Sequence, residues 1–287
     1  MHTSFLSHAK GRYFWLAVLL MVGSIASYAM DNPTEAPNGG TWLGYTLGTI
    51  AALLIVWLAY LGRRKRNFSQ GWGTVRGWVS AHVYLGSSLL VVVTLHTGFQ
   101  FGWNVHTFAF GLMCLTIFSG FFGVFAYRTY PSARNDLKNS QTLDDVFLKV
   151  EKIDSELARL TADSSSDTKM VVNSAIERTV IGGGYRGQLF GRDLSSVVLR
   201  GKVVPNKGQQ PALEFLVEKL SRTEGKENQS VGEIVRTFND RKRLLDIIRE
   251  DIRMQSTTHV WLLFHVPVTF ALIAALIAHI FSVFVYR

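Results

Sequence analysis

The sequence predicts an all-α transmembrane helical bundle of five spans, carrying a cytoplasmic, mostly helical α+β insertion. Two observations predict this architecture. Five apolar stretches approach or exceed the roughly 20 residues that a bilayer requires, and one polar, charge-dense region separates the fourth stretch from the fifth. The predicted domains are residues 1–128 with spans one to four, residues 129–256 as the insertion, and residues 257–287 with span five.

The five predicted spans cover residues 13–30, 42–61, 78–100, 107–128 and 258–285. The first follows Lys10 and Arg12 and ends in small residues, as a cleavable secretory signal does. We nevertheless expect it to be retained as a helix, and its cleavage would leave the orientation of the other spans unchanged.

Basic residues in the short loops predict the orientation, because Lys and Arg concentrate on the cytoplasmic side. The loops on the other side, DNPTEAPNGG and FGWNV, contain neither Lys nor Arg. The N-terminus and residues 129–256 are therefore expected in the cytoplasm of a bacterial-type inner (plasma) membrane, with the C-terminus at Arg287 outside. The basic residues that set this orientation are Lys10, Arg12, Arg63, Arg64, Lys65, Arg66 and Arg76.

Local patterns predict several elements of the insertion. Apolar residues at three- and four-residue steps predict a helix over 143–160, and the polar run 161–169 predicts a loop. Two β-prone runs around Arg200-Gly201 predict a hairpin, and Pro211 is expected at the first position of a short helix. From about residue 231 a helix is expected to run without a break into span five.

Charge and cysteine content exclude several kinds of site. The chain has a formal net charge of +9, but the insertion has nearly equal numbers of acids and bases, so no nucleic-acid partner is expected. The single cysteine, Cys114, excludes an intrachain disulfide, covalent haem attachment and a cysteine-ligated iron–sulfur cluster. Residues 182–187 match G-x-G-x-x-G but lack the flanking strand, helix and acid of a nucleotide site, and they are interpreted as a glycine-rich turn.

Four histidines inside apolar segments are the main functional signal. His82 and His96 lie in span three, His265 and His279 lie in span five, and each pair is 14 residues apart. That spacing is about 40° short of four helical turns and about 21 Å along the axis, so each helix presents two imidazoles on one face. Histidine is unfavourable in hydrocarbon and usually marks function there.

The two spans are expected to run parallel, because one further span separates them. His82 and His265 then share a cytoplasmic level, and His96 and His279 share an outer level. Four imidazoles at two levels predict the axial ligation of two haem b groups, one above the other. Two levels about 20 Å apart cannot form one non-haem metal site.

Other residues are candidate supports for such cofactors. Arg76 and Arg128 are placed for propionates at the cytoplasmic level or for membrane anchoring, and Gly86 lies one turn after His82. His106 could replace His96 or contact an outer propionate, whereas His259 is expected at the membrane surface. Pro267 is expected to kink span five just after His265.

Two parallel spans, each with histidines 14 residues apart, resemble the di-haem transmembrane cytochromes b. The likeness is to the cytochrome b/b6 core and, more loosely, to ferric-reductase and b561-like bundles; it covers residues 78–128 and 258–285. It implies that His82, His96, His265 and His279 hold two haems b and that electrons cross the membrane. The insertion has no counterpart in that resemblance, and the Pro-Glu-Trp-Tyr motif of a quinone site is absent from the sequence.

These observations favour an electron-transfer subunit that connects other redox protein subunits on one or both membrane faces. It would itself be part of an oxidoreductase rather than a complete enzyme, and a quinone is possible as a further cofactor. One alternative is a non-redox membrane adaptor or sensor, whose histidines only pack helices. Another is a terminal reductase of a small oxidant or metal ion, which would turn over as an isolated chain.

Overall fold

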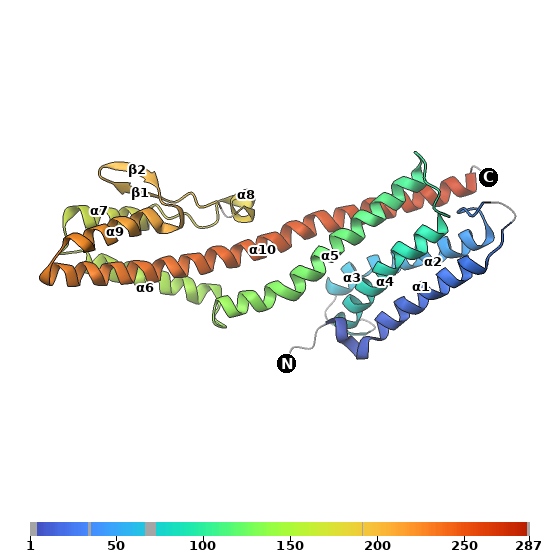
Figure 1. The fold of residues 1–287 in the computed structure, drawn as a ribbon, viewed down its shortest axis with the longest axis horizontal. Coiled ribbons are helices and arrows are strands. Elements are labelled where there is room, and N and C mark those ends of the chain that lie inside the picture. The colour runs from blue at the N-terminus through green and yellow to red at the C-terminus, as the bar shows by residue number, and fades with distance from the viewer. Residues whose placement is uncertain (1–4, 34–35, 67–72, 191, 286–287) are drawn as a thin grey trace. The chain divides into compact units, whose positions relative to one another are not determined.

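The computed structural model describes residues 5–33, 36–66, 73–190 and 192–285, without the side chains of residues 5–7, 66, 185 and 186. The predicted outer end at Arg287 lies outside these residues. The chain divides into two compact units (Figure 1), which are Met1–Arg128 with Trp261–Arg287, and Thr129–Val260.

The first unit consists of helices. Among the described residues, five helices of the chain are long and apolar enough to cross a membrane. Thr41 and Thr74 begin two of them, each accepting a hydrogen bond from a backbone N–H of the first turn, as N-cap residues do. The elements are η1 (Phe5–Gly11), α1 (Arg12–Met30), α2 (Trp42–Ala59), α3 (Leu61–Arg66), α4 (Val75–His96), the first part of α5 (Val105–Leu137) and the last part of α10 (Gly225–Val285).

The apolar surfaces of these helices are largely uncovered. At most a third of the residues in each apolar window are buried within the protein. A soluble protein rarely leaves so much contiguous apolar surface in water. The exposed side chains include Leu16, Leu19, Val22, Leu53, Val56, Phe118, Phe270 and Phe281.

The core of the first unit lies mainly between α2 and α4. Leu47 and Ile55 of α2 pack with Leu89 and Val92 of α4, and Met113 of α5 joins the same cluster. This packing fixes the rotation of α4, which carries two of the four candidate histidines.

α5 extends beyond the predicted end of span four at residue 128, reaching Leu137. Pro131 lies inside it. Proline removes one intrahelical hydrogen bond, and α5 continues through it for a further six residues.

The second unit is mostly helical, with one small sheet. Strands β1 and β2 pair antiparallel, with Val197 opposite Val204 and Leu199 opposite Lys202. The elements are the end of α5, α6 (Leu143–Leu160), α7 (Ser166–Glu177), α8 (Gly184–Leu189), β1 (Ser196–Leu199), β2 (Lys202–Pro205), η2 (Lys207–Gln209), α9 (Gln210–Arg222) and the first part of α10.

Three predicted elements of this unit are confirmed. α6 has the predicted bounds and begins with a capping box between Thr142 and Asp145. The hairpin turns at Arg200-Gly201, where both residues have positive φ. α9 begins at Gln210, one residue before the predicted start, so Pro211 is its second residue.

Two local predictions were wrong in part. The loop expected over 161–169 ends early, because α7 begins at Ser166 and runs to Glu177; Val171, Val172 and Ala175 bury its apolar face. The glycine-rich stretch does turn, with positive φ at Gly182, Gly183 and Gly184, but a six-residue helix, α8, follows at once.

The long helix expected from residue 231 into span five is confirmed as one element. α10 runs from Gly225 to Val285 and contains Pro267. It begins six residues before the predicted start, within a polar stretch that contains no proline.

Buried ion pairs accompany the cores of the second unit. The guanidinium of Arg241, whose side chain is 2% exposed, pairs with Asp154 and also donates to Thr179 and Gln209. The buried carboxylate of Asp251 on α10 pairs with Arg134 at 2.9 Å and Lys138 at 2.7 Å. Each pair offsets the free-energy cost of removing its charged groups from water.

Candidate functional site: two levels of paired histidines

The four candidate histidines lie in two facing pairs within the first unit. The imidazole of His82 on α4 faces that of His265 on α10, with ring centroids 6.5 Å apart. One level further along the helices, His96 faces His279 at 6.0 Å. Each pair therefore takes one imidazole from α4 and one from α10.

The ring separations can be compared with axial ligation. An iron held by two imidazole nitrogens at about 2 Å each would have ring centroids roughly 6 Å apart. Both pairs have this separation in an edge-to-face arrangement, a separation that directly packed aromatic rings also adopt.

The Nδ1 atom of each α4 histidine meets a backbone carbonyl of α2. His82 Nδ1 lies 3.1 Å from the carbonyl oxygen of Leu58, and His96 Nδ1 lies 2.7 Å from that of Gly44. A carbonyl only accepts, so Nδ1 must carry the proton and donate. The lone pair then resides on Nε2, the form in which imidazole binds a metal.

The Nδ1 atoms of the α10 histidines meet side chains of α5. His265 Nδ1 lies 2.7 Å from Ser119 Oγ. The Ser119 hydroxyl donates to the carbonyl of Thr116 at 2.8 Å, so its oxygen is placed to accept from His265. His279 Nδ1 contacts His106 Nδ1, and that hydrogen bond takes its direction from the protonation of the two rings.

The four contacts share one pattern. Every histidine uses Nδ1 for a supporting helix, α2 for the α4 pair and α5 for the α10 pair. Within the described part of the chain, Nε2 of none of the four histidines makes a hydrogen bond. Ligand histidines typically show this division, with one nitrogen oriented by the protein and the other left for the metal.

Glycines allow close approach to the imidazoles. A Cβ added at Gly48 of α2 would lie 2.7 Å from Cε1 of His96, and one at Gly39 would lie 3.2 Å from the same atom. At the other level, a Cβ on Gly120 of α5 would lie 3.7 Å from Cε1 of His265. His96 thus lies in a cradle that a methyl group would fill.

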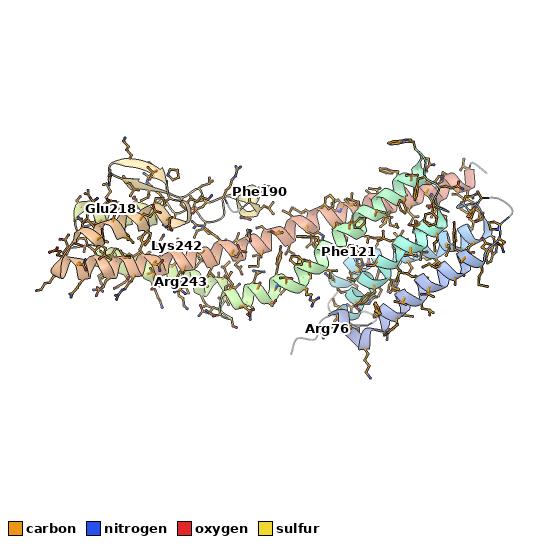
Figure 2. All side chains as sticks on the ribbon, viewed as in Figure 1. Arg76, Phe121, Phe190, Glu218, Lys242 and Arg243 are labelled. Carbon is orange, nitrogen blue, oxygen red and sulfur yellow. The ribbon has the colours of Figure 1, made fainter. Side chains whose placement is uncertain are left out.

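A cavity of about 90 Å³ lies between α2, α4, α5 and α10 at the His82–His265 level. His82, His265, Gly86, Gly120 and Phe121 are among the residues that line it; Figure 2 labels Phe121 on α5. The volume suffices for several water molecules and is smaller than a porphyrin. The donor set of two imidazoles suits a haem, and entry of a haem would require side chains between these helices to move apart.

Trp261 packs beside the His82–His265 pair. Its indole ring lies 5.2 Å from the ring of His265, and its Nε1 donates to the carbonyl of Ser119 at 2.7 Å. A Cβ on Gly123 would overlap this indole, so the glycine is required for the contact. Ser119 therefore contacts both Trp261 and His265.

The remaining predicted site residues have different environments. Arg76, in the first turn of α4, and Arg128 on α5 are both exposed. Gly86 lines the cavity at the His82–His265 level. A Cβ added at Gly86 would have a side-chain carbon of Leu58 as its nearest neighbour. His106 contacts His279, with ring centroids 4.6 Å apart.

Sequence reasoning missed the contribution of α2. Gly44 and Gly48 form a G-x-x-x-G pattern in the second span, a signal of close helix packing in membranes. It could have indicated that α2 supports a neighbouring helix, but not that a histidine would occupy the space.

In the described residues there is no group of three or more His, Cys, Asp or Glu side chains that could hold a metal ion. Each level supplies two imidazoles, so the other ligands of a six-coordinate iron would have to come from a macrocycle. The chain itself has no matching family model, curated protein or solved structure.

Proposed function

We propose that this chain is a membrane b-type cytochrome that carries two bis-histidyl haems and moves electrons across an inner membrane. The observation that carries the proposal is the shared geometry of the two pairs: facing rings about 6 Å apart, with all four Nδ1 atoms bound to supporting helices. Haem, when bound, supplies one-electron chemistry at iron; the protein supplies the ligands and their surroundings.

Membrane insertion is supported by the uncovered apolar surfaces of the five helices. In the proposed orientation, the N-terminus and the second unit lie in the cytoplasm, because Lys and Arg concentrate in the loops on that side. His82 and His265 would hold the cytoplasmic haem, and His96 and His279 the outer one.

Each histidine has a defined role in this proposal. Nε2 would ligate iron, while the Nδ1 contact sets the tautomer and the ring orientation. The levels are about 20 Å apart, since 14 residues separate the two histidines of each helix. Trp261 and Phe121 supply apolar surface beside the His82–His265 pair, and such surroundings influence the reduction potential of a bound haem.

Arg76 and Arg128 are proposed as partners for propionates at the cytoplasmic surface, where both are exposed. His106 is proposed as the support of His279 rather than as a ligand, because it contacts Nδ1 of that residue. Other redox subunits would dock on the two membrane faces. We do not assign a quinone site.

The test is a pyridine haemochrome assay with a reduced-minus-oxidised spectrum on the purified, detergent-solubilised chain. The expected result is two haems b per chain, falling to one in His265→Ala and to one in His279→Ala. His259→Ala is the matched control on the same helix and should keep both haems. Retention of both haems in either ligand variant would contradict the assignment.

A further inference from the structure

The segment from α8 to Leu194 leaves large apolar side chains uncovered. Phe190 is 75% exposed and Leu194 is 63% exposed. Figure 2 labels Phe190 beside α8, with its side chain on the outside of the second unit. Exposed aromatic and aliphatic groups in one short segment indicate an interaction surface rather than a defect of folding.

This segment is attached to α10 close to the beginning of its apolar run. Ser256 Oγ donates to Gln188 Oε1 of α8 at 2.7 Å. Ser256 precedes Trp261 by five residues, which is about 7.5 Å of helix rise. The predicted membrane span of α10 begins at residue 258, so the hydrogen bond fixes α8 within about one turn of that span.

The backbone geometry makes the attachment specific. Gly182, Gly183 and Gly184 all have positive φ and reverse the chain before α8. The N–H of Arg192 then donates to the carbonyl of Gly187 at 3.0 Å, which closes the chain after α8. Phe190 directly follows α8 and is exposed.

The charges of the segment favour an anionic surface. Arg192 is exposed, whereas the neighbouring carboxylate of Asp193 has little exposed surface and is neutralised by Arg249 at 3.0 Å. Asp193 also accepts from the backbone N–H groups of Ser195 and Gly208. The acid is thus turned inward while the base remains at the surface.

We infer that Phe190, Arg192 and Leu194 bind the phospholipid headgroup region of the membrane that α10 crosses. Phe190 and Leu194 would insert at the boundary between headgroups and acyl chains, and Arg192 would contact lipid phosphates, as in interfacial segments of other proteins. The inference rests on the membrane insertion in the proposed function and is independent of haem. It gives the second unit a lipid contact besides its covalent continuity with α10.

The test uses single-cysteine variants of the full chain in nanodiscs of zwitterionic and anionic phospholipid. Cys114 is replaced by Ala, and an environment-sensitive fluorophore is attached at Phe190→Cys, Val203→Cys or Phe270→Cys. Val203 is the matched control, since it is also apolar and 59% exposed but lies on the hairpin. Nitroxide lipids labelled at the headgroup or deep in the acyl chain serve as quenchers.

The expected result is loss of most of the fluorescence at 190 with the headgroup quencher, and little loss at 203 with either quencher. Position 270 should be quenched by the deep probe, which reports the insertion of α10. If position 270 is quenched while positions 190 and 203 are equally and weakly quenched, the lipid contact is overturned but the insertion of α10 is not. A protein partner would then cover Phe190 and Leu194. Absence of quenching at 270 would overturn the insertion itself.

Discussion

His106 and His279 meet through their Nδ1 atoms, so a surface histidine of α5 supports an imidazole of α10. Ser119 has the same relation to His265 at the other level. The two supports differ chemically, because a hydroxyl oxygen and an imidazole nitrogen polarise the bound ring to different degrees. The two proposed haems should therefore respond to different single substitutions.

His106→Ala is expected to change the outer haem and leave the inner one unaffected. Loss of an orienting group typically weakens metal binding by about 10- to 100-fold. The measurement is low-temperature electron paramagnetic resonance of the oxidised protein, in which one low-spin signal should shift or be lost.

Ser119→Ala is the reciprocal control and should alter the other signal. If both substitutions changed the same signal, the separation into two levels would be wrong. Unchanged spectra in both variants would show that these contacts do not orient the ligands.

Gly48→Ala should displace His96 and release the outer haem. The added methyl would lie 2.7 Å from Cε1 and 2.8 Å from Nδ1 of His96, closer than such atoms pack, and that ring is held by the carbonyl of Gly44. Haem content should fall from two toward one per chain, with the spectrum of the inner haem retained.

Gly111→Ala is the matched control, because a Cβ at Gly111 meets nothing within 4 Å. It should keep both haems and gain up to about 1 kcal/mol of helix stability, the usual difference between alanine and glycine. Equal haem loss in the two variants would show that helix packing in general, rather than the cradle around His96, is responsible.

Removing the carboxylate that pairs with the buried Arg241 should strongly destabilise the second unit. Asp154→Ala leaves the 2% exposed Arg241 without its carboxylate, and breaking a buried pair in this way costs about 3 kcal/mol. Urea denaturation followed by far-ultraviolet circular dichroism should show the earlier unfolding of this unit.

Asp240→Ala is the control for that substitution, since Asp240 is exposed and lies 3.9 Å from Arg243, an exposed residue that Figure 2 labels on α10. This substitution should change the free energy of unfolding by no more than about 0.5 kcal/mol, as for most surface ion pairs. A comparable loss in both variants would contradict a special role for the buried pair.

The capping box of α6 should make the second unit sensitive to acid. Hydrogen bonds from the side chain and backbone of Thr142 lower the pKa of Asp145 below its usual value of 3.8. A carboxylate with a lowered pKa stabilises the folded state above its unfolded pKa, and this stabilisation is lost as pH falls through the folded pKa.

Asp145→Asn should therefore lower the thermal midpoint of the second unit at neutral pH, and the difference from the parent chain should shrink below about pH 4, near the ordinary carboxyl pKa. Thermal melts at several pH values would measure it. A difference that is constant with pH would show that the carboxylate charge does not contribute.

The sequence predicted the helices and the levels of the histidines, because helix geometry depends on few variables. A rise of 1.5 Å per residue converts the 14-residue spacing into height, so the pairing of His82 with His265 needed no tertiary information. The capping box of α6 and the hairpin at Arg200-Gly201 are similarly local. Their signals lie within a few residues of the element that they form.

The supporting contacts could not be predicted in the same way. Gly44 and Gly48 match a pattern that is frequent in membrane helices, and nothing in it indicates which neighbouring side chain will fill the space. The contact between His106 and His279 joins residues 173 positions apart, and it depends on the rotation of α5. α7 was missed because its serine-rich first turn has the composition of a loop.

The supporting helices divide the first unit into two halves, since α2 holds both histidines of α4 and α5 holds both histidines of α10. Each half orients its own two imidazoles, and Met113 of α5 and Leu272 of α10 pack in the same core as α2 and α4. In the proposed function, haem would add a bridge between the halves at two heights. A chain divided between Gly98 and Asn104 and produced as two co-expressed fragments should accordingly reassemble when haem is supplied.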